Sequence, residues 1–87
     1  MSLLDDNVIP GSYGMIFSSN AKYPEDQTRI SKAILQVEGV KDVVWNEEEI
    51  FPKELTVHTH EIVPVKRIAD KVKKLGFNVI PKQEFPL

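Results

Sequence analysis

Two segments of this chain change from a helical to a strand-like spacing of apolar residues at a glycine. In each segment, apolar residues recur at steps of three and four positions, which places them on one helical face, and the glycine supplies the left-handed conformation that ends such a helix. The spacing then changes from a period of 3.6 to a period of two, which indicates a strand. The matching residues are Ile30, Ile34, Val37, Gly39 and Val40 in the first half, and Ile68, Val72, Leu75, Gly76 and Phe77 in the second. This repeat predicts two similar units.

Each unit begins with a further strand, so the predicted order is strand, helix, strand, twice over. We expect strands at residues 13–19, 40–45, 55–59 and 77–80, a first helix at 24–38, and a second helix between Pro64 and Gly76. Two such units with right-handed crossovers interleave into a four-stranded antiparallel sheet with both helices on one face. The predicted fold is therefore α+β, a ferredoxin-like βαββαβ two-layer sandwich at residues 14–81, with an N-terminal lead-in at 1–13 and a C-terminal tail at 82–87.

Composition limits the classes of function that the chain can have. Its 87 residues include 11 Lys and Arg against 13 Asp and Glu, a net charge of −2, so no overall basic field attracts nucleic acid or an anionic membrane. The absence of cysteine excludes a disulfide framework, a thiolate metal site and a cysteine nucleophile. No apolar run approaches the roughly 20 residues of a membrane span, and the sequence does not open with a signal-peptide pattern. We expect a cytoplasmic protein that binds neither nucleic acid nor a membrane.

The pattern around the first helix also carries a family resemblance. The run I-S-K-A-I-L-Q-V-E-G-V-K-D-V-V at residues 30–44, with Leu75, Gly76 and Phe77 after the second helix, is similar to one known family. It is the heavy-metal-associated domain family of copper chaperones, metal-ATPase amino-terminal modules and mercury-binding proteins. The resemblance covers about residues 14–80 and implies the ferredoxin-like fold.

Members of that family bind metal through a Cys-x-x-Cys pair ahead of the first helix, which this chain lacks. Counting back from Ile30 places Tyr23 and Asp26 at the two cysteine positions. Their hard oxygen atoms do not suit the thiolate site that copper(I) requires. The resemblance therefore implies a heavy-metal-associated-like domain without thiolate ligands.

Two histidines suggest a different metal site. His58 and His60 are two residues apart at a predicted strand, so both imidazoles are expected on one face, within reach of one zinc or nickel ion. The strand register that buries Val43 against Val57 sets Asp42 directly across from His58, where it could be a third ligand. The alternative interpretation is that Asp42 and His58 form an exposed cross-strand pair and that His60 is solvated.

The sheet face that the helices leave open is the predicted contact surface. Val44, Thr56 and His58 lie on this face, and apolar residues of the first and last strands are expected to extend it. Uncovered apolar positions favour association with another protein surface. We therefore expect a protein partner or self-association there, as a heteromeric contact or a homodimer.

The second helix offers a charged surface of its own. Against a single acidic residue, Asp70, it carries five basic residues, which are Lys66, Arg67, Lys71, Lys73 and Lys74. This surface is either a docking site for an acidic partner or an ordinary solvated helix face.

No sequence motif supports an enzyme. The chain lacks cysteine and a Gly-rich phosphate loop, and no pair of buried carboxylates is evident. We therefore predict a non-catalytic binding or interaction module that carries no cofactor. The alternatives are a metal-handling protein that uses His58 and His60, and a small-ligand sensor or enzyme subunit that uses the open sheet face.

Overall fold

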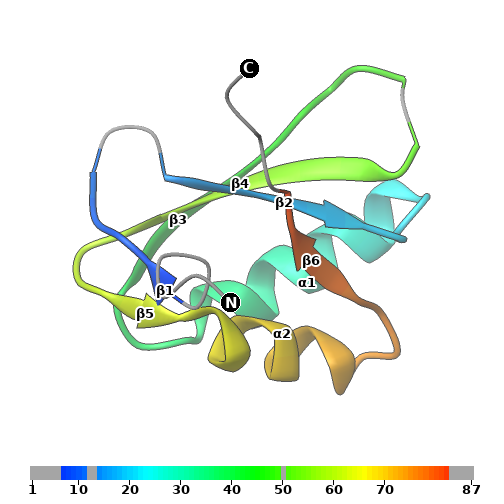
Figure 1. Ribbon diagram of the computed structural model, residues 1–87. Helices are drawn as coiled ribbons and strands as arrows, with labels where there is room; N and C mark the ends of the chain where they lie inside the picture. The colour runs from blue at the N-terminus through cyan, green and yellow to red at the C-terminus, as the bar shows by residue number, and fades with distance from the viewer. Residues whose placement is uncertain (1–6, 12–13, 50, 83–87) are drawn as a thin grey trace.

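The computed structural model describes residues 7–11, 14–49 and 51–82, which form six strands and two helices (Figure 1). In chain order these are β1 (Asn7–Val8), β2 (Met15–Ser19), α1 (Pro24–Leu35), β3 (Val40–Trp45), β4 (Lys53–Thr59), β5 (Val63–Pro64), α2 (Val65–Lys73) and β6 (Val79–Pro81). The predicted alternation of strand, helix and strand is present in both halves. β1 and β5 are additional short strands.

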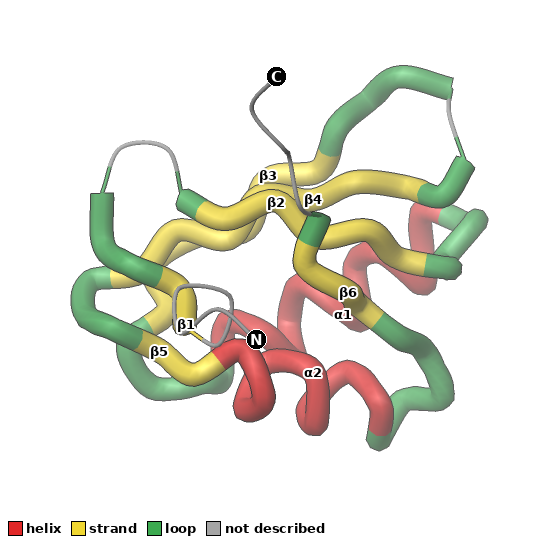
Figure 2. The backbone as a smooth tube through the Cα atoms, in the orientation of Figure 1, coloured by secondary structure: helices red, strands yellow, loops and turns green. Residues whose placement is uncertain are grey.

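Four strands form the main sheet in the order β3-β4-β2-β6, and every neighbouring pair is antiparallel. Both helices lie on the same side of this sheet (Figure 2). The predicted α+β class with a four-stranded antiparallel sheet is therefore confirmed. The predicted register is confirmed as well, because Val43 lies opposite Val57 and Asp42 lies opposite His58.

The ends of the helices differ from the predicted ones. α1 stops at Leu35 instead of residue 38, because the N–H groups of Gln36 and Val37 donate to carbonyls only three residues back, which tightens the last turn. Gly39 then has a φ of 94°, so the predicted left-handed stop is present. α2 starts at Val65, because the preceding residue pairs within β5.

The short pair β1 and β5 closes one end of the core and was not predicted. Val8 and Val63 pair across it, and both side chains are buried. Part of the N-terminal lead-in thus contributes to the core. The last strand is shorter than expected, since β6 begins at Val79, and Phe77 precedes it as a partly buried residue packed against the core.

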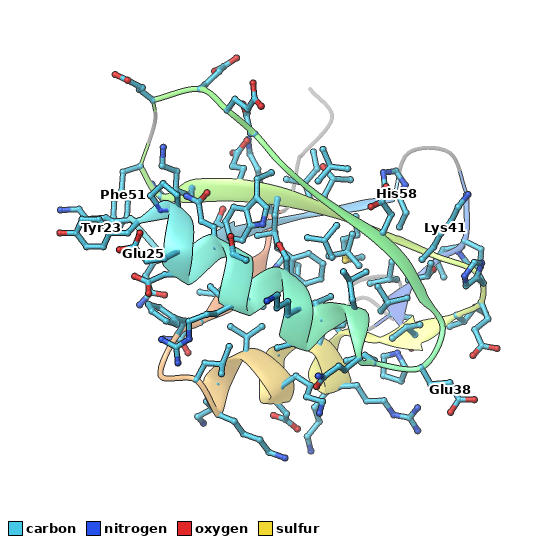
Figure 3. The ribbon with its side chains drawn as sticks, turned by 180° about the vertical axis from the view of Figure 1, so that it is seen from behind. Tyr23, Glu25, Glu38, Lys41, Phe51 and His58 are labelled. Carbon is cyan, nitrogen blue, oxygen red and sulfur yellow. The ribbon has the colours of Figure 1, made fainter. Side chains whose placement is uncertain are left out.

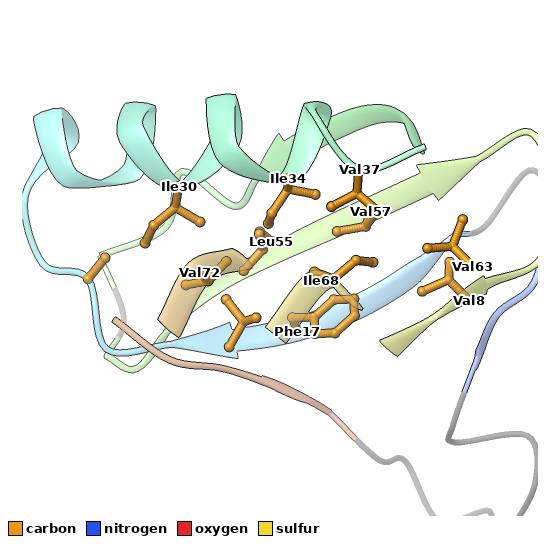
Figure 4. Packing of buried hydrophobic residues seen from close by; sticks show 12 residues of the cluster. Val8, Phe17, Ile30, Ile34, Val37, Leu55, Val57, Val63, Ile68 and Val72 are labelled. Carbon is orange, nitrogen blue, oxygen red and sulfur yellow. The ribbon is translucent and has the colours of Figure 1, made fainter. Parts of the chain in front are cut away.

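The core lies between the inner face of the main sheet and the two helices (Figure 4). Its twelve buried apolar residues are Val8, Phe17, Ala21, Ile30, Ile34, Val37, Leu55, Val57, Val63, Ile68, Val72 and Val79. α1 supplies Ile30 and Ile34 from one face, as the spacing of four predicts. Strand alternation then directs the intervening residues of β2, β3 and β4 to the opposite side of the sheet.

Candidate functional site

The open sheet face is built from three rows of side chains that cross the strands. Strand pairing puts Val44, Thr56 and Ile16 in the middle row, because Thr56 lies opposite both of the others. One flanking row contains Asp42 and His58, and the other contains Glu54, Ser18 and Ile80. No described helix covers this face (Figure 1). Val44 is 49% exposed and Ile80 is 64% exposed.

The predicted contact residues Val44, Thr56 and His58 thus share one face, and Ile16 and Ile80 extend it. Neither isoleucine could be placed from the sequence alone, because the order of the strands decides which of them are neighbours. The sequence signal for both isoleucines is strand alternation: Phe17 and Val79 are buried, so the neighbouring Ile16 and Ile80 lie on the opposite face of the sheet. The result is an apolar diagonal across the sheet with polar residues on both sides.

An ion pair borders this face at the end where β4 begins. The Lys82 ammonium donates to Glu54 Oε2 at 2.7 Å, and the Lys82 backbone N–H donates to the carbonyl of Ile16. The hydrogen bond from Lys82, together with its charge and a weaker hydrogen bond from Asn46, lowers the pKa of Glu54, although partial desolvation opposes this shift. The pair ties the residue after β6 to the centre of the sheet.

A polar pocket borders the other end of the face. It has a volume of about 440 Å³ and is lined by Gly11, Lys41, Asp42, His58 and Thr59. A bulge between Val40 and Asp42 interrupts the ladder at Lys41, and Figure 3 shows Lys41 and His58 at the same end of the sheet. The pocket therefore offers a cation, a carboxylate and an imidazole near one another.

Gly14 lets the start of β2 pass close to His58. Its φ is 64°, and a Cβ atom at this position would lie 2.6 Å from the Val57 carbonyl oxygen and 2.9 Å from His58 Nδ1. Only glycine combines this backbone conformation with so close an approach. The imidazole is thus held against the backbone of the neighbouring strand.

The predicted metal ligands are brought together only in part. Register places Asp42 opposite His58, but the Asp42 carboxylate already accepts a hydrogen bond from the N–H of Val43. His60 follows the end of β4, and its N–H donates to the Gly39 carbonyl at 2.7 Å, so strand alternation does not fix its direction. In the described part of the chain, no three His, Asp or Glu side chains form a group that could hold a metal ion.

The start of α1 and the residue ahead of it are the two positions that the family resemblance aligns with cysteines. Tyr23 is the residue before the helix and is exposed, while Asp26 is in the first turn, 3.9 Å from Arg29. Figure 3 shows Tyr23 and Phe51 at the same end of the molecule, and the Lys22 ammonium lies 5.7 Å from the Phe51 ring centroid. The described residues at this end are aromatic and charged, and none of those named here is a soft metal ligand.

The basic residues of α2 lie on the helix layer, away from the open sheet face. Among the described residues, the ion pairs are those of Arg29 with Asp26 and of Lys82 with Glu54, so α2 takes part in none.

Within residues 7–11, 14–49 and 51–82, neither helix is long and apolar enough to cross a membrane. Comparisons with protein-family models, with curated proteins and with solved structures found no significant match.

Proposed function

We propose that this chain is a non-catalytic interaction module that binds a protein surface through its open sheet face. We also propose that it is a heavy-metal-associated-like domain with the ferredoxin-like arrangement. The interleaving of β2, α1 and β3 with β4, α2 and β6 supports this arrangement, as does the sequence pattern of residues 30–44. The missing thiolate ligands direct the proposal toward interaction instead of metal transport.

The observation that carries this function is the uncovered apolar diagonal of Val44, Ile16 and Ile80. Val44 and Ile80 keep 49% and 64% of their surface exposed on the two edge strands of the main sheet, and Ile16 lies between them on β2. Removing half of a valine side chain from water contributes about 1 kcal/mol. Several such side chains on one surface favour association.

A second copy of the chain is the occupant that this face fits best. One border of the face has the Glu54 and Lys82 pair, and the other has Asp42 beside His58. Glu54 and Lys82 leave one border without a net charge, and the other carries the Asp42 carboxylate, so a twofold contact that sets unlike borders together does not oppose like net charges.

Sedimentation velocity over a range of concentrations tests this proposal. Wild type should associate, and Val44→Lys should remain monomeric because an unpaired ammonium would have to be buried. Leu35→Lys is the matched control, since Leu35 is 47% exposed but lies on α1. A wild type that stays monomeric at high concentration excludes the second copy as occupant, and an equal effect of both substitutions assigns the association to another surface.

Metal handling is the second candidate, and the cross-strand placement of Asp42 opposite His58 favours it. Two ligands of this kind would bind zinc weakly unless His60 or a partner supplied a third. The remaining alternative, a small-ligand sensor or enzyme subunit, would use the pocket that His58 and Lys41 line.

A further inference from the structure

The charge of this protein is distributed unevenly between α2 and the rest of the chain. Residues 65–74 contain five basic residues and one acidic residue, a net charge of +4, whereas the whole chain carries −2. All other residues together therefore carry −6. None of the five basic residues has an ion-pair partner among the described residues. Their charge is available to a ligand.

A groove on the helix layer collects part of this charge. It has a volume of about 240 Å³ and lies between the end of α1 and α2, where it is lined by Val37, Glu38, Arg67, Asp70, Lys71 and Lys74. Three lining residues belong to α2 and Lys74 directly follows it in a helical conformation. The four are spaced by three, one and three positions, so they share one face. Figure 3 shows Glu38 at the end of α1 that is remote from Tyr23.

The groove combines apolar walls with a cationic rim. The buried side chain of Val37 contributes to its lining, and the long side chains of Arg67, Lys71 and Lys74 can contribute aliphatic stems while their charged ends reach water. Such a groove accepts an apolar side chain between cations.

We infer that this groove is a docking site for an acidic protein segment that contains an apolar anchor residue. The anchor would enter the groove, and flanking carboxylates would pair with Arg67, Lys71 and Lys74. The groove lies on the helix layer, whereas the proposed self-association uses the opposite side of the sheet. The domain could therefore bind this segment while its sheet face is occupied.

The observations favour an acidic protein segment over nucleic acid or an anionic membrane. Glu38 and Asp70 line the groove and would repel a continuous row of phosphates, whereas a peptide can place its carboxylates selectively. The remaining charge of −6 would also oppose a long polyanion, whose binding depends on neutralising many phosphates. Finally, apolar walls favour a side chain over a phosphate backbone.

Fluorescence anisotropy with the full chain tests the inference. The probe is a fluorescein-labelled peptide in which glutamates flank two leucines. One control peptide replaces the glutamates with lysines, and another replaces the leucines with serines. The first peptide should bind at least about tenfold more tightly than either control, because both charge and apolar contact contribute. Equal binding of the leucine and serine peptides would refute the proposed apolar anchor in the groove, since only the charge of the peptide would then be recognised.

A pair of charge-matched variants locates the site. Arg67→Glu with Lys71→Glu changes the groove, whereas Lys66→Glu with Lys73→Glu makes the same change in charge on the same helix outside the groove lining. The groove variant should lose about tenfold or more in affinity, and the control should lose much less. Equal losses would refute a defined groove. Circular dichroism checks folding, and Arg67→Gln with Lys71→Gln repeats the test with a milder change.

Further measurements distinguish this inference from the proposed function and from other ligands of the groove. Val44→Lys should leave peptide binding unchanged, and a loss there would assign the peptide to the sheet face. Duplex DNA or phosphatidylserine vesicles that bind more tightly than the acidic peptide, with the same dependence on Arg67 and Lys71, would overturn the choice of a protein segment. Sedimentation of the groove variant shows whether the segment belongs to a second copy, because self-association would then decrease.

Discussion

Gly39 and Gly76 hold equivalent places in the repeat of the sequence, yet we expect alanine to affect them unequally. Both have positive φ angles, 94° and 89°, so alanine should cost about 1 to 2 kcal/mol of backbone strain at either position. The entropy that alanine removes from the unfolded chain is the same for both and cancels when they are compared. Only the surroundings of the two residues differ.

The surroundings predict a further loss of stability at Gly39. A Cβ atom there would lie 2.8 Å from Glu61 Cγ and 2.8 Å from Val63 Cγ2, whereas nothing lies within 4 Å of one at Gly76. The exposed Glu61 side chain can move aside, but Val63 is buried and packed in the core. Overpacking of a buried methyl typically costs about 1 to 3 kcal/mol. Gly39→Ala should therefore be less stable than Gly76→Ala by about 1 to 2 kcal/mol.

Urea unfolding measures this difference through circular dichroism and the fluorescence of Trp45, the single tryptophan. Its indole N–H donates to Ser31 Oγ at 2.7 Å, so the fluorescence reports the contact between α1 and β3. Wild type, Gly39→Ala and Gly76→Ala should show a similar dependence of the free energy of unfolding on urea concentration. Their unfolding midpoints should differ. Equal free energies of unfolding for the two variants would refute the claim that contact with Val63 matters.

Two further predictions concern the borders of the open sheet face. Because Lys82 lowers the pKa of Glu54, their pair should stabilise the fold above the ordinary carboxyl pKa of 4.5, and this contribution should disappear as pH falls through the lowered value. The difference in stability between wild type and Lys82→Met should therefore be constant above pH 4.5 and decrease below it, and a difference that stays constant on acidification would contradict this. Zinc binding, measured by calorimetry, should be weak, because register brings only Asp42 and His58 together. Equal binding by wild type and by the double variant His58→Ala with His60→Ala would exclude the histidine site.

The elements that the sequence predicts best are those with a sustained period. The bounds of β3 agree with the predicted residues 40–45, because residues 42–45 alternate between exposed and half-buried and the strand follows a glycine whose positive φ ends the preceding turn. The same alternation predicts the register of Asp42 with His58. By contrast, β1 and β5 have two residues each, too few to show a period. Their pairing depends on tertiary contacts with the core.

Helix length is harder to predict than helix position. Val37 continues the apolar spacing of α1 and is buried, as a helical residue would be. Its hydrogen bond to the carbonyl of Ile34, however, belongs to a tightened turn after the helix. The spacing of apolar residues cannot distinguish these two backbone conformations, because both place the side chain against the core.

The candidate site separates into residues that strand alternation predicts and residues that require strand order. Val44, Thr56 and His58 follow from alternation within β3 and β4. Ile16 and Ile80 become part of the same surface only because β2 lies between β4 and β6. The groove between α1 and α2 depends on how the two helices pack, about which their separate sequences say little.

The two proposed contact surfaces lie on opposite layers, and this placement has an energetic consequence. The core separates Val44 on the sheet from Arg67 and Lys71 on the helix layer, and no described hydrogen bond or ion pair links the two sets. Substitutions at distant sites without shared partners usually change free energies additively, to within about 0.5 kcal/mol. Val44→Lys should therefore weaken self-association equally with and without the acidic peptide. A larger difference would mean that the core transmits a change between the layers, so that the domain couples its two partners instead of only bridging them.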